Sequence, residues 1–534
     1  MIGYLPRDHA LIHAFARLAP ASRAPRAAAA APKGFRQVPR LSDYVRGEEI
    51  LAAKGLRERA ISGLAVDSRR VGPGMLFFAL PGRQRDGAEF IADAVGRGAV
   101  AVVSERMPAL PSAGVTYLQV ADVRAALARA AQRHFKFPDR ELALVGVTGM
   151  RGKTSVAHLT KHLLNGDRRI GLIGSVHYAL GARTVPSTGT TPEALEVYGL
   201  MAQMRDAGCR QAVIELSGLA LEQRRVSGLA LDVAVFTGGS AESGESTVDS
   251  EADYRRFFRL FAGLDGPVPK VAAVNVDDAA GRRLAAHLVA EVPATRVVTF
   301  GEDPAAGVRA DAVTCDLGRS RFRLVWPGGT KLIETPLVGR FNVANVLAAV
   351  AAAIGLGRDP AVFLSKLRTF PGAPGRLERV AAGQAATVLV DSAHTAAELK
   401  RTLAALRTLT AGRLLVVFGC GGNRERAGRP DMTRAVQAQA DFAFATADNP
   451  RREGVARIFA DMRAGVTAPS RITWIEDRRR AIGYALELAR PGDCVVIAGK
   501  GHENCQEVSD TMFPFDDRQV VRELLAPVAV GAAS

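Results

Sequence analysis

Short apolar runs alternate, along most of this chain, with stretches in which apolar residues recur every three or four positions. Such alternation predicts β-sheets covered by helices. Between residues 41 and 139 the pattern predicts strands at Met75–Leu80, Ala99–Val103 and Thr116–Val120, and helices at Glu89–Arg97 and Val123–His134. We expect this part to form an α/β domain.

Two further series of strands follow. From residue 141 to about residue 370 we expect strands at Val213–Leu216, Val233–Thr237 and Val271–Asn275, in a parallel sheet covered on both faces. Beyond Pro371–Gly375 we expect strands at Thr387–Val390, Leu414–Phe418, Phe442–Thr446 and Cys494–Ile497. A chain of 534 residues is expected to hold about three domains, so the predicted fold is α/β with three domains.

A phosphate-binding loop is predicted where the apolar run Leu142–Val147 ends. Gly149-Met150-Arg151-Gly152 reads as a turn, and Lys153-Thr154-Ser155 opens a helix-like pattern that runs to Leu164. Backbone N–H groups freed by the glycines, together with a helix N-terminus, bind phosphate. Lys153 would neutralise β- or γ-phosphate oxygens, and the Thr154 hydroxyl would hold Mg²⁺. The general pattern has one more glycine where this chain has Val147, so the match is to a shortened form.

Four polar clusters follow four of the predicted strands of the last series. They are Asp391–His394, Gly419–Arg424, Asp448–Arg451 and Gly499–Glu503. Any one of them is accounted for as a turn with satisfied polar groups. Because ligands of open α/β sheets bind beyond the carboxyl ends of the strands, four such clusters predict a shared cleft.

Composition excludes several classes of protein. No apolar run approaches the ~20 residues that span a bilayer. The five cysteines are scattered and form no CxxC pair, which argues against disulfides or structural zinc and fits a reducing cytoplasm. A net charge of +16 is typical of nucleic-acid-binding proteins, but no basic stripe is interleaved with aromatics. We therefore attribute the charge to arginine-rich composition, a basic tail and a site for anionic nucleotides.

Residues 1–42 differ from the rest. They carry seven Arg and Lys residues, one acidic residue and an Ala/Pro-rich stretch, which is a poor core former. We expect a disordered basic extension. It faintly resembles an organelle transit segment, and because it has no apolar core like that of a secretion signal, secretion is not expected.

Several motifs together resemble those of the Mur ligase family. The motifs are Asp67-Ser68-Arg69-Arg70, Thr190-Thr191-Pro192-Glu193, Gly339-Arg340-Phe341-Asn342 with Asn345, Gly375–Arg379, Asp391–His394, and Asp448–Arg451 with Gly499 and Glu503. The resemblance covers about Leu41 to Leu525. It points to the branch that adds the third amino acid, diaminopimelate, to the UDP-N-acetylmuramoyl-dipeptide of peptidoglycan.

The resemblance implies roles for particular residues. Lys153, Glu215, Arg376 and His394 would be catalytic, and Thr154 and Glu215 would bind Mg²⁺. ATP would be bound by Gly149, Arg151, Gly152, Lys153, Thr154, Ser155, Asn342, Asn345, Arg376 and Asp391. The acid and amino-acid substrates would be bound by Ser68, Thr190, Thr191, Ser217, Arg225, Asp448, Asn449, Arg451, Gly499 and Glu503. Arg451 would clamp a carboxylate and Glu503 would bind an ammonium group.

In this family ATP phosphorylates the substrate carboxylate, an amine attacks the acyl phosphate, and two Mg²⁺ ions are usual. The chain departs from the pattern at the second ion. Leu219 stands where the family has a metal-binding His, and Phe258, counted from Tyr254, stands where it has a carbamylated Lys. Gly238–Glu245 also differs from the family's loop. Leu and Phe offer no lone pair to a hard cation, so one Mg²⁺ is expected and the second is not. Arg151, if it turns inward, or a carboxylate such as Glu242 or Glu245 would supply replacement charge.

We therefore expect an ATP-dependent acid–amino-acid ligase in the cytoplasm, with reduced activity. It would act on a UDP-muramoyl-peptide-like molecule without nucleic acid. Two alternatives stay open: a degenerate paralogue that binds nucleotide or UDP-peptide as a regulator or scaffold, and a ligase redirected to another substrate. The predicted domains are residues 43–140, UDP-binding-like; 141–371, ATP-binding; and 372–534, Rossmann-like and amino-acid-binding.

Overall fold

The computed structural model describes residues 38–82, 85–166, 169–239 and 250–526. The expected basic extension lies almost wholly outside these residues, and so do Glu242 and Glu245. The described elements confirm the α/β fold predicted from the sequence. No described helix is long and apolar enough to cross a bilayer.

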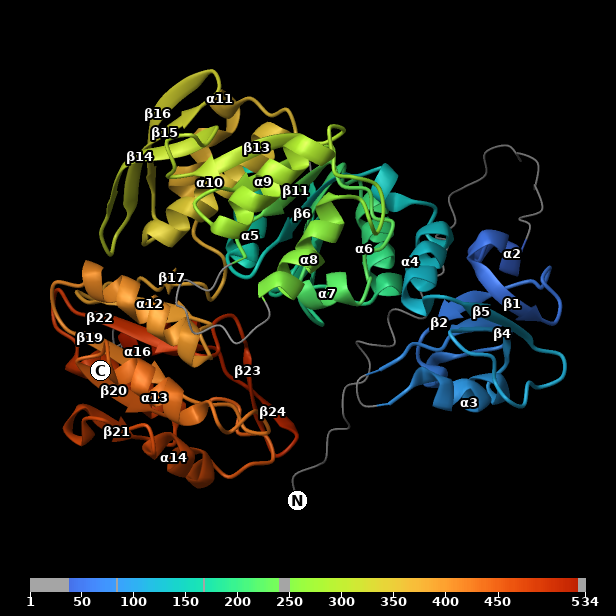
Figure 1. The fold of residues 1–534 in the computed structure, drawn as a ribbon. Coiled ribbons are helices and arrows are strands. Elements are labelled where there is room, and N and C mark those ends of the chain that lie inside the picture. Colours follow the sequence, from blue (N-terminus) through green and yellow to red (C-terminus); the bar gives the residue numbers. More distant parts are fainter. Residues whose placement is uncertain (1–37, 83–84, 167–168, 240–249, 527–534) are drawn as a thin grey trace, which may run out of the picture. The chain divides into compact units, whose positions relative to one another are not determined.

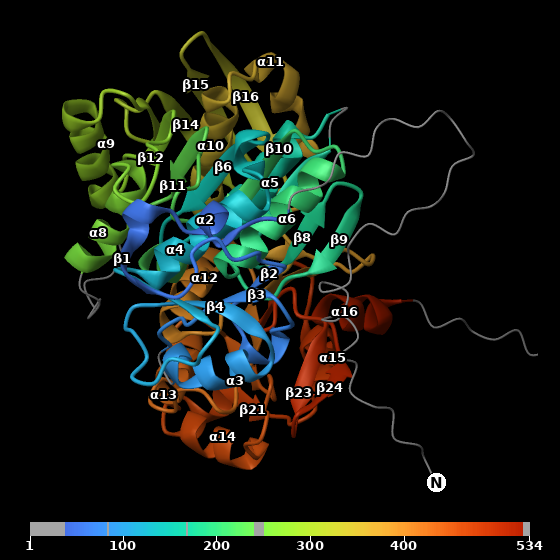
Figure 2. The same cartoon turned by 90° about the vertical axis from the view of Figure 1, so that its right-hand side faces the viewer.

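The N-terminal sheet has the strand order β1-β5-β4-β3-β2, and Figure 2 shows α2 and α3 near it. Its strands are β1 (Ile50–Lys54), β2 (Gly63–Ala65), β3 (Met75–Phe78), β4 (Ala99–Ser104) and β5 (Thr116–Val120). All are parallel to their neighbours except β1, which is antiparallel to β5. The helices are α2 (Leu41–Tyr44), α3 (Ile91–Gly96) and α4 (Val123–His134). Apolar residues of α2 and α4 pack on one face and those of α3 on the other.

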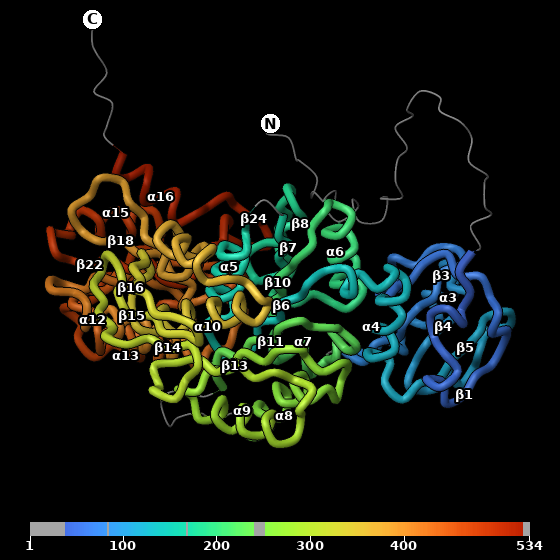
Figure 3. The backbone as a smooth tube through the Cα atoms, turned by 90° about the horizontal axis from the view of Figure 1, so that it is seen from above, coloured from blue at the N-terminus to red at the C-terminus, as the bar shows by residue number. Residues whose placement is uncertain are grey.

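The central sheet has the order β16-β15-β14-β13-β12-β11-β6-β10-β7-β8-β9 (Figure 3). The strands that flank the phosphate loop are β6 (Ala143–Thr148), β7 (Ile170–Ile173), β10 (Gln211–Glu215), β11 (Val233–Phe236), β12 (Val271–Asn275) and β13 (Arg296–Gly301). They are parallel, as expected. Further strands, which we did not predict, extend both edges: β8 (His177–Leu180), β9 (Arg183–Pro186), β14 (Val308–Cys315), β15 (Ser320–Trp326) and β16 (Gly329–Thr335). Of these, β14 is parallel to β13, whereas the pairs β14–β15, β15–β16, β7–β8 and β8–β9 are antiparallel.

Helices cover both faces of this sheet (Figure 1). On one face lie α5 (Lys153–Leu164) and α10 (Arg340–Gly355), with α11 (Pro360–Phe363) beside them. On the other face lie α6 (Ala194–Asp206), α7 (Gly218–Glu222), α8 (Ser250–Phe261) and α9 (Ala279–Glu291). Since β6 pairs with both β10 and β11, the carboxyl ends of these three strands meet at the phosphate loop.

The C-terminal sheet has the order β17-β18-β22-β19-β20-β21. Its strands are β17 (Glu378–Arg379), β18 (Thr387–Asp391), β19 (Leu414–Phe418), β20 (Phe442–Ala445), β21 (Ile472–Trp474) and β22 (Cys494–Ala498). One face is covered by α12 (Ala396–Leu409), α13 (Arg429–Gln437) and α14 (Val455–Arg463), and the other by α15 (Arg478–Leu488) and α16 (Asp517–Leu525). A separate hairpin is formed by β23 (Cys505–Val508) and β24 (Thr511–Pro514).

Candidate functional site

Two glycines give the phosphate loop its shape. Gly149 has φ +127° and Gly152 has φ +77°, in the left-handed region that favours glycine. A Cβ atom added to Gly149 would lie 2.3 Å from Thr237 Oγ1, and one added to Gly152 would lie 2.4 Å from Asn345 Oδ1. Any larger residue at either position would clash with the groups that hold the loop.

Neighbouring elements hold the loop from two sides. Thr237 Oγ1, after β11, donates to the carbonyls of Thr148 (3.1 Å) and Arg151. From α10, the buried Asn345 donates to Asn342 Oδ1 (3.0 Å), and Asn342 donates to a backbone carbonyl (2.9 Å). Asn345 therefore packs against Gly152 of the loop, and Asn342 holds Asn345 in place.

Lys153 begins α5 and folds back over the loop. Its Nζ donates to the carbonyls of Gly149 (2.7 Å) and Met150 (3.2 Å). Burial lowers the pKa of this ammonium group, and the nearby Glu215 carboxylate opposes that effect. A half-buried cation that the described part of the chain holds through loop carbonyls is suited to bind an anion that enters the loop. Ser155 follows in the first turn of the same helix.

Glu215 ends β10 as a fully buried carboxylate beside the loop. Its Oε2 accepts from Thr154 Oγ1 (2.9 Å) and Ser175 Oγ (3.0 Å), and its Oε1 accepts from Ser175 N (3.0 Å). Burial raises the pKa of this carboxyl group, and these hydrogen bonds oppose the rise. Thr154 and Glu215 bring two oxygen donors together, which fits the usual Mg²⁺ site of one or two protein oxygens plus phosphates and waters.

The loop before α6 lies next to this pair. Thr190 Oγ1 is 2.9 Å from Ser175 Oγ, and Thr191 Oγ1 donates to the Glu215 carbonyl (2.7 Å). Ser217 N donates to Thr191 Oγ1 (3.0 Å), and Arg225 Nη1 donates to the Thr191 carbonyl (2.6 Å). The structure thus brings together Thr190, Thr191, Ser217 and Arg225, as the sequence predicted.

Sequence reasoning missed Ser175, although a signal was present. Ser175 follows Gly174 at the carboxyl end of the parallel strand β7, where ligand-binding residues of such sheets lie. Because β7 is not among the predicted strands, Ser175 is not among the predicted site residues.

Apolar side chains, Leu219 and Phe258, stand where the family has ligands for a second cation. Leu219, on α7, is 40% exposed. The ring on α8 that lies against α7 is Phe257, whose Cζ is 3.9 Å from a Cβ atom added to Gly218. Phe258 instead packs against His287 of α9, with ring centroids 4.4 Å apart. Phe257 thus faces α7, whereas Phe258, the position counted from Tyr254, faces α9.

Metal ligands are few in this region. In the described part of the chain, no three His, Cys, Asp or Glu side chains gather so that they could hold a metal ion. The Arg151 guanidinium is half-buried and has no hydrogen bond or ion pair with any described residue. The side chains present thus fit one Mg²⁺ at Thr154 and Glu215, but Leu219 and Phe257 do not fit a second.

The C-terminal sheet carries a second polar group beyond β20 and β22. Asn449 Nδ2 donates to Glu503 Oε2 (2.8 Å), and Lys500 Nζ donates to Asn449 Oδ1 (2.8 Å) and Glu503 Oε2 (3.0 Å). The Lys500 side chain has 0% exposure, whereas that of Glu503 is 41% exposed. Lys500 and Asn449 lower the pKa of the Glu503 carboxyl group against the effect of its burial. Sequence reasoning missed this buried lysine, since lysines are rarely buried unless paired.

Asp448 and Arg451 lie beside this group. Asp448 is buried, which raises the pKa of its carboxyl group, and its Oδ2 is 2.5 Å from a Cβ atom added to Gly499. Arg451 has φ +54°, an unusual backbone conformation for a residue other than glycine. Its Nε pairs with Glu507 Oε2 (2.9 Å) and its Nη1 donates to the Gly422 carbonyl (2.9 Å). Protein groups thus occupy two positions of the guanidinium that we expected to hold a ligand carboxylate.

The turn that carries Arg376 is fixed by Asp391. The buried carboxylate of Asp391 accepts from Leu377 N (2.8 Å) and Ala393 N (2.9 Å), and burial raises the pKa of this group. His394 is exposed before α12, with Nδ1 2.8 Å from the Ser392 carbonyl. Asp391 thus positions the backbone of the turn, and the exposed side chain of His394 is accessible to a ligand.

Ser68, the predicted substrate residue of the N-terminal sheet, is buried in a 3₁₀ turn. Its hydroxyl hydrogen-bonds the Asp93 carboxylate and lowers the pKa of that group. Asp67 caps the turn by accepting from Arg69 N (3.0 Å). The motif therefore fixes its own backbone, and its proposed substrate role stays a prediction.

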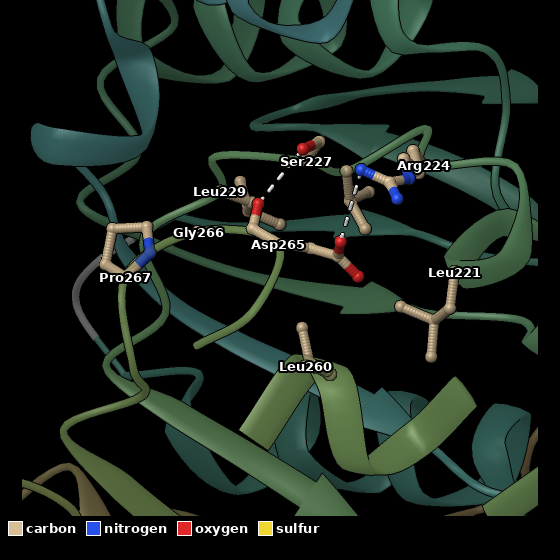
Figure 4. Close-up of a pocket in the computed structure, with 9 residues that line it drawn as sticks. Leu221, Arg224, Ser227, Leu229, Leu260, Asp265, Gly266 and Pro267 are labelled. Carbon is tan, nitrogen blue, oxygen red and sulfur yellow. Dashed lines mark hydrogen bonds and ion pairs between the residues drawn. The ribbon is translucent and has the colours of Figure 1, made fainter. Parts of the chain in front are cut away.

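A further pocket in the central domain is too small for a ligand (Figure 4). Its volume is about 10 Å³, which is room for one water molecule at most. Asp265 lies between Ser227 and Arg224: its carbonyl accepts from Ser227 Oγ (3.0 Å) and its carboxylate lies 3.7 Å from Arg224. We assign this pocket a structural role.

Comparison with known proteins agrees with these arrangements. Three models match in succession: "Mur ligase family, catalytic domain" at residues 60–135, "Mur ligase middle domain" at 147–353 and "Mur ligase, glutamate ligase domain" at 375–501. The UDP-N-acetylmuramoyl-L-alanyl-D-glutamate--2,6-diaminopimelate ligase of Gloeobacter violaceus is 40% identical over 490 residues, covering 90% of this chain and 98% of its own. The chain belongs to the Mur ligase family. It is an ATP-dependent ligase.

Other relatives extend the comparison. A protein of the same name from Streptomyces coelicolor is 41% identical over 475 residues, covering 87% of this chain and 92% of its own. A solved structure of a UDP-N-acetylmuramoyl-L-alanyl-D-glutamate--2,6-diaminopimelate ligase is 31% identical, with a TM-score of 0.65, and covers 91% of this chain and 99% of its own. A folylpolyglutamate synthase of Mycobacterium tuberculosis shares the fold, with 20% identity and a TM-score of 0.57.

Proposed function

We propose that this Mur ligase joins an amino acid to the free carboxylate of a UDP-N-acetylmuramoyl-peptide, with diaminopimelate as the amino acid. The observation that carries the proposal is the cluster of Lys153, Thr154, Glu215, Thr190 and Thr191, because it sets a phosphate loop beside a loop of hydroxyl donors. Relatives named for this reaction are 40% identical over nearly the whole chain. We also propose the domain boundaries 43–140, 141–371 and 372–534.

The chain's own residues account for the first half of the reaction. Lys153 and the loop N–H groups would bind the phosphates of ATP, and Thr190 and Thr191 would hold the acid substrate near the γ-phosphate. Thr154 and Glu215 would hold Mg²⁺, which screens the negative charge of the phosphates when it is bound. In such phosphoryl transfers the protein contributes positioning and cationic charge. The carboxylate is phosphorylated, and the amine of the amino acid then displaces phosphate to form the amide.

We propose further that turnover is reduced because a second cation has no ligand at Leu219, at Phe258 or at Phe257, the ring that faces α7. Removing one preorganised charge from such a site typically costs ~10²–10³ in rate. These missing ligands favour one alternative, a paralogue that binds ATP and the UDP-peptide without joining an amino acid to the peptide. Mass spectrometry after long incubation with ATP, UDP-N-acetylmuramoyl-dipeptide and diaminopimelate distinguishes the two. The ligase should form a tripeptide product that depends on ATP, whereas absence of product despite binding of both ligands would favour the paralogue.

Replacing Arg451 by Lys should impair recognition of diaminopimelate. The lysine ammonium keeps the positive charge but loses the planar guanidinium. In Arg451 that group contacts Glu507 and the Gly422 carbonyl through Nε and Nη1, which leaves Nη2 for a ligand. Loss of one charge-assisted hydrogen bond, worth ~1.5–3 kcal/mol, should raise the KM for diaminopimelate about tenfold or more. The matched control is Arg452→Lys, since Arg452 is 71% exposed and pairs only with Asp510 at the surface. Equal use of diaminopimelate and lysine by the unmodified chain would contradict this assignment.

A further inference from the structure

We propose that Ser175 is a positioning residue that couples the ATP·Mg²⁺ end of the site to the acid-substrate loop. The inference rests on the proposed function and deepens it. Ser175 lies between the two ends: its hydroxyl is 3.0 Å from Glu215 Oε2 on one side and 2.9 Å from Thr190 Oγ1 on the other.

The hydrogen bonds have a defined direction. Glu215 as a carboxylate can only accept hydrogen bonds, so the Ser175 hydroxyl donates to Glu215. Because Ser175 has a single hydroxyl proton, it accepts the hydrogen bond from Thr190. Thr154 also donates to Glu215 Oε2 (2.9 Å). The line Thr190–Ser175–Glu215–Thr154 therefore runs without a gap from the acid-substrate loop to the phosphate loop.

Contacts of the Ser175 backbone and of the preceding Gly174 with Glu215 hold Ser175 in place. Its N–H donates to Glu215 Oε1 (3.0 Å), and a Cβ atom added to Gly174 would lie 2.2 Å from the same oxygen. The Gly174–Ser175 backbone thus packs directly on the buried carboxylate. A hydroxyl at this position cannot move away from Glu215 without the loss of two hydrogen bonds.

This line of hydrogen bonds should couple the binding of ATP·Mg²⁺ at one end to the binding of the UDP-peptide at the other. Hydrogen bonds in a partly buried line polarise one another, so a substrate oxygen that engages Thr190 changes the strength of the Ser175–Glu215 hydrogen bond, and through Glu215 that of the Thr154 hydrogen bond. Such coupling is reciprocal: the UDP-peptide should strengthen ATP binding by the factor by which ATP strengthens UDP-peptide binding. Typical coupling between two sites is about 5- to 150-fold.

The test measures binding and needs no turnover. Calorimetry gives the affinity of the full chain for a non-hydrolysable ATP analogue with Mg²⁺, with and without saturating UDP-N-acetylmuramoyl-dipeptide. In the unmodified chain the dipeptide should strengthen binding at least about fivefold. Ser175→Ala should reduce this factor to near one, while Ser175→Thr, which restores a hydroxyl, should keep most of it. In a double-mutant cycle, Ser175→Ala and Thr190→Val should have non-additive effects.

The control is Ser187→Ala, because among the described residues the Ser187 hydroxyl bonds to the backbone of Gly189 in the same loop and to nothing else. It should leave the coupling factor unchanged. The inference is overturned if Ser175→Ala keeps the factor of the unmodified chain, or if Ser187→Ala loses it equally. If the unmodified chain binds the ATP analogue but not the UDP-dipeptide, the proposed function falls and this inference with it. A Ser175→Ala variant that unfolds at the temperature of the unmodified chain shows that the effect is local.

Discussion

Lys153→Ala should weaken ATP·Mg²⁺ binding by well over tenfold. Lys153 is the half-buried cation of the phosphate loop, and among the described residues its ammonium group donates to the carbonyls of Gly149 and Met150. A charge-assisted contact in a partly desolvated site is worth ~1.5–3 kcal/mol, which corresponds to roughly a 10- to 150-fold change in affinity. Calorimetry with ATP and Mg²⁺ measures this change directly.

Lys161→Ala is the matched control for this variant. Lys161 lies on the same helix, α5, two turns beyond the loop, so its removal deletes the same charge from the same element. Its ATP affinity should stay close to that of the unmodified chain. Equal affinity of the Lys153→Ala and Lys161→Ala variants would remove Lys153 from the nucleotide site.

Restoring ligands for the second cation should raise turnover. The double variant Leu219→His with Phe257→Lys places an imidazole on α7 and an amine on the α8 position that faces it. In bicarbonate buffer the amine can form a carbamate. We expect turnover to rise at least about tenfold, because one preorganised charge in such a site is worth ~10²–10³ in rate. The double variant should gain more than the two single variants together, since the ligands act as a unit.

The structure supplies a control for this restoration. Phe258→Lys with Leu219→His adds the same groups, but position 258 faces His287 on α9 instead of α7. It should give no gain. Phe257 is a buried core residue, so thermal unfolding must show that the Phe257→Lys chains remain folded. Folded double variants that bind no additional Mg²⁺ and gain no activity would contradict this account of the second site.

The phosphate loop could be predicted because its determinants are local. Two glycines, a lysine and a threonine follow one another after an apolar strand, and the structure places them as that order implies. Most of the parallel strands were also predicted closely, because buried strands of such sheets read as continuous apolar runs. The edge strands β9 and β14 to β16 were not predicted, because they carry charged residues that break such runs.

The rest of the site depends on contacts that no local pattern encodes. Ser175 is 40 residues from Glu215, and Lys500 pairs with Asn449 across 51 residues. Neither pairing has a sequence signature. Phe257 and Phe258 differ by one residue, yet each helix position turns by about 100°, so one faces α7 and the other α9. Counting residues from Tyr254 could not resolve that rotation.

We propose that this chain is a working but slow ligase with one cation site. The most direct test is steady-state phosphate release by the unmodified chain with ATP, Mg²⁺, UDP-N-acetylmuramoyl-dipeptide and diaminopimelate. We predict measurable turnover that requires all three substrates and lies far below the ~1–10³ s⁻¹ typical of enzymes. Turnover in the ordinary range would show that Arg151 or another group has rebuilt the missing charge, and no turnover at all would show that the chain is not a ligase for these substrates.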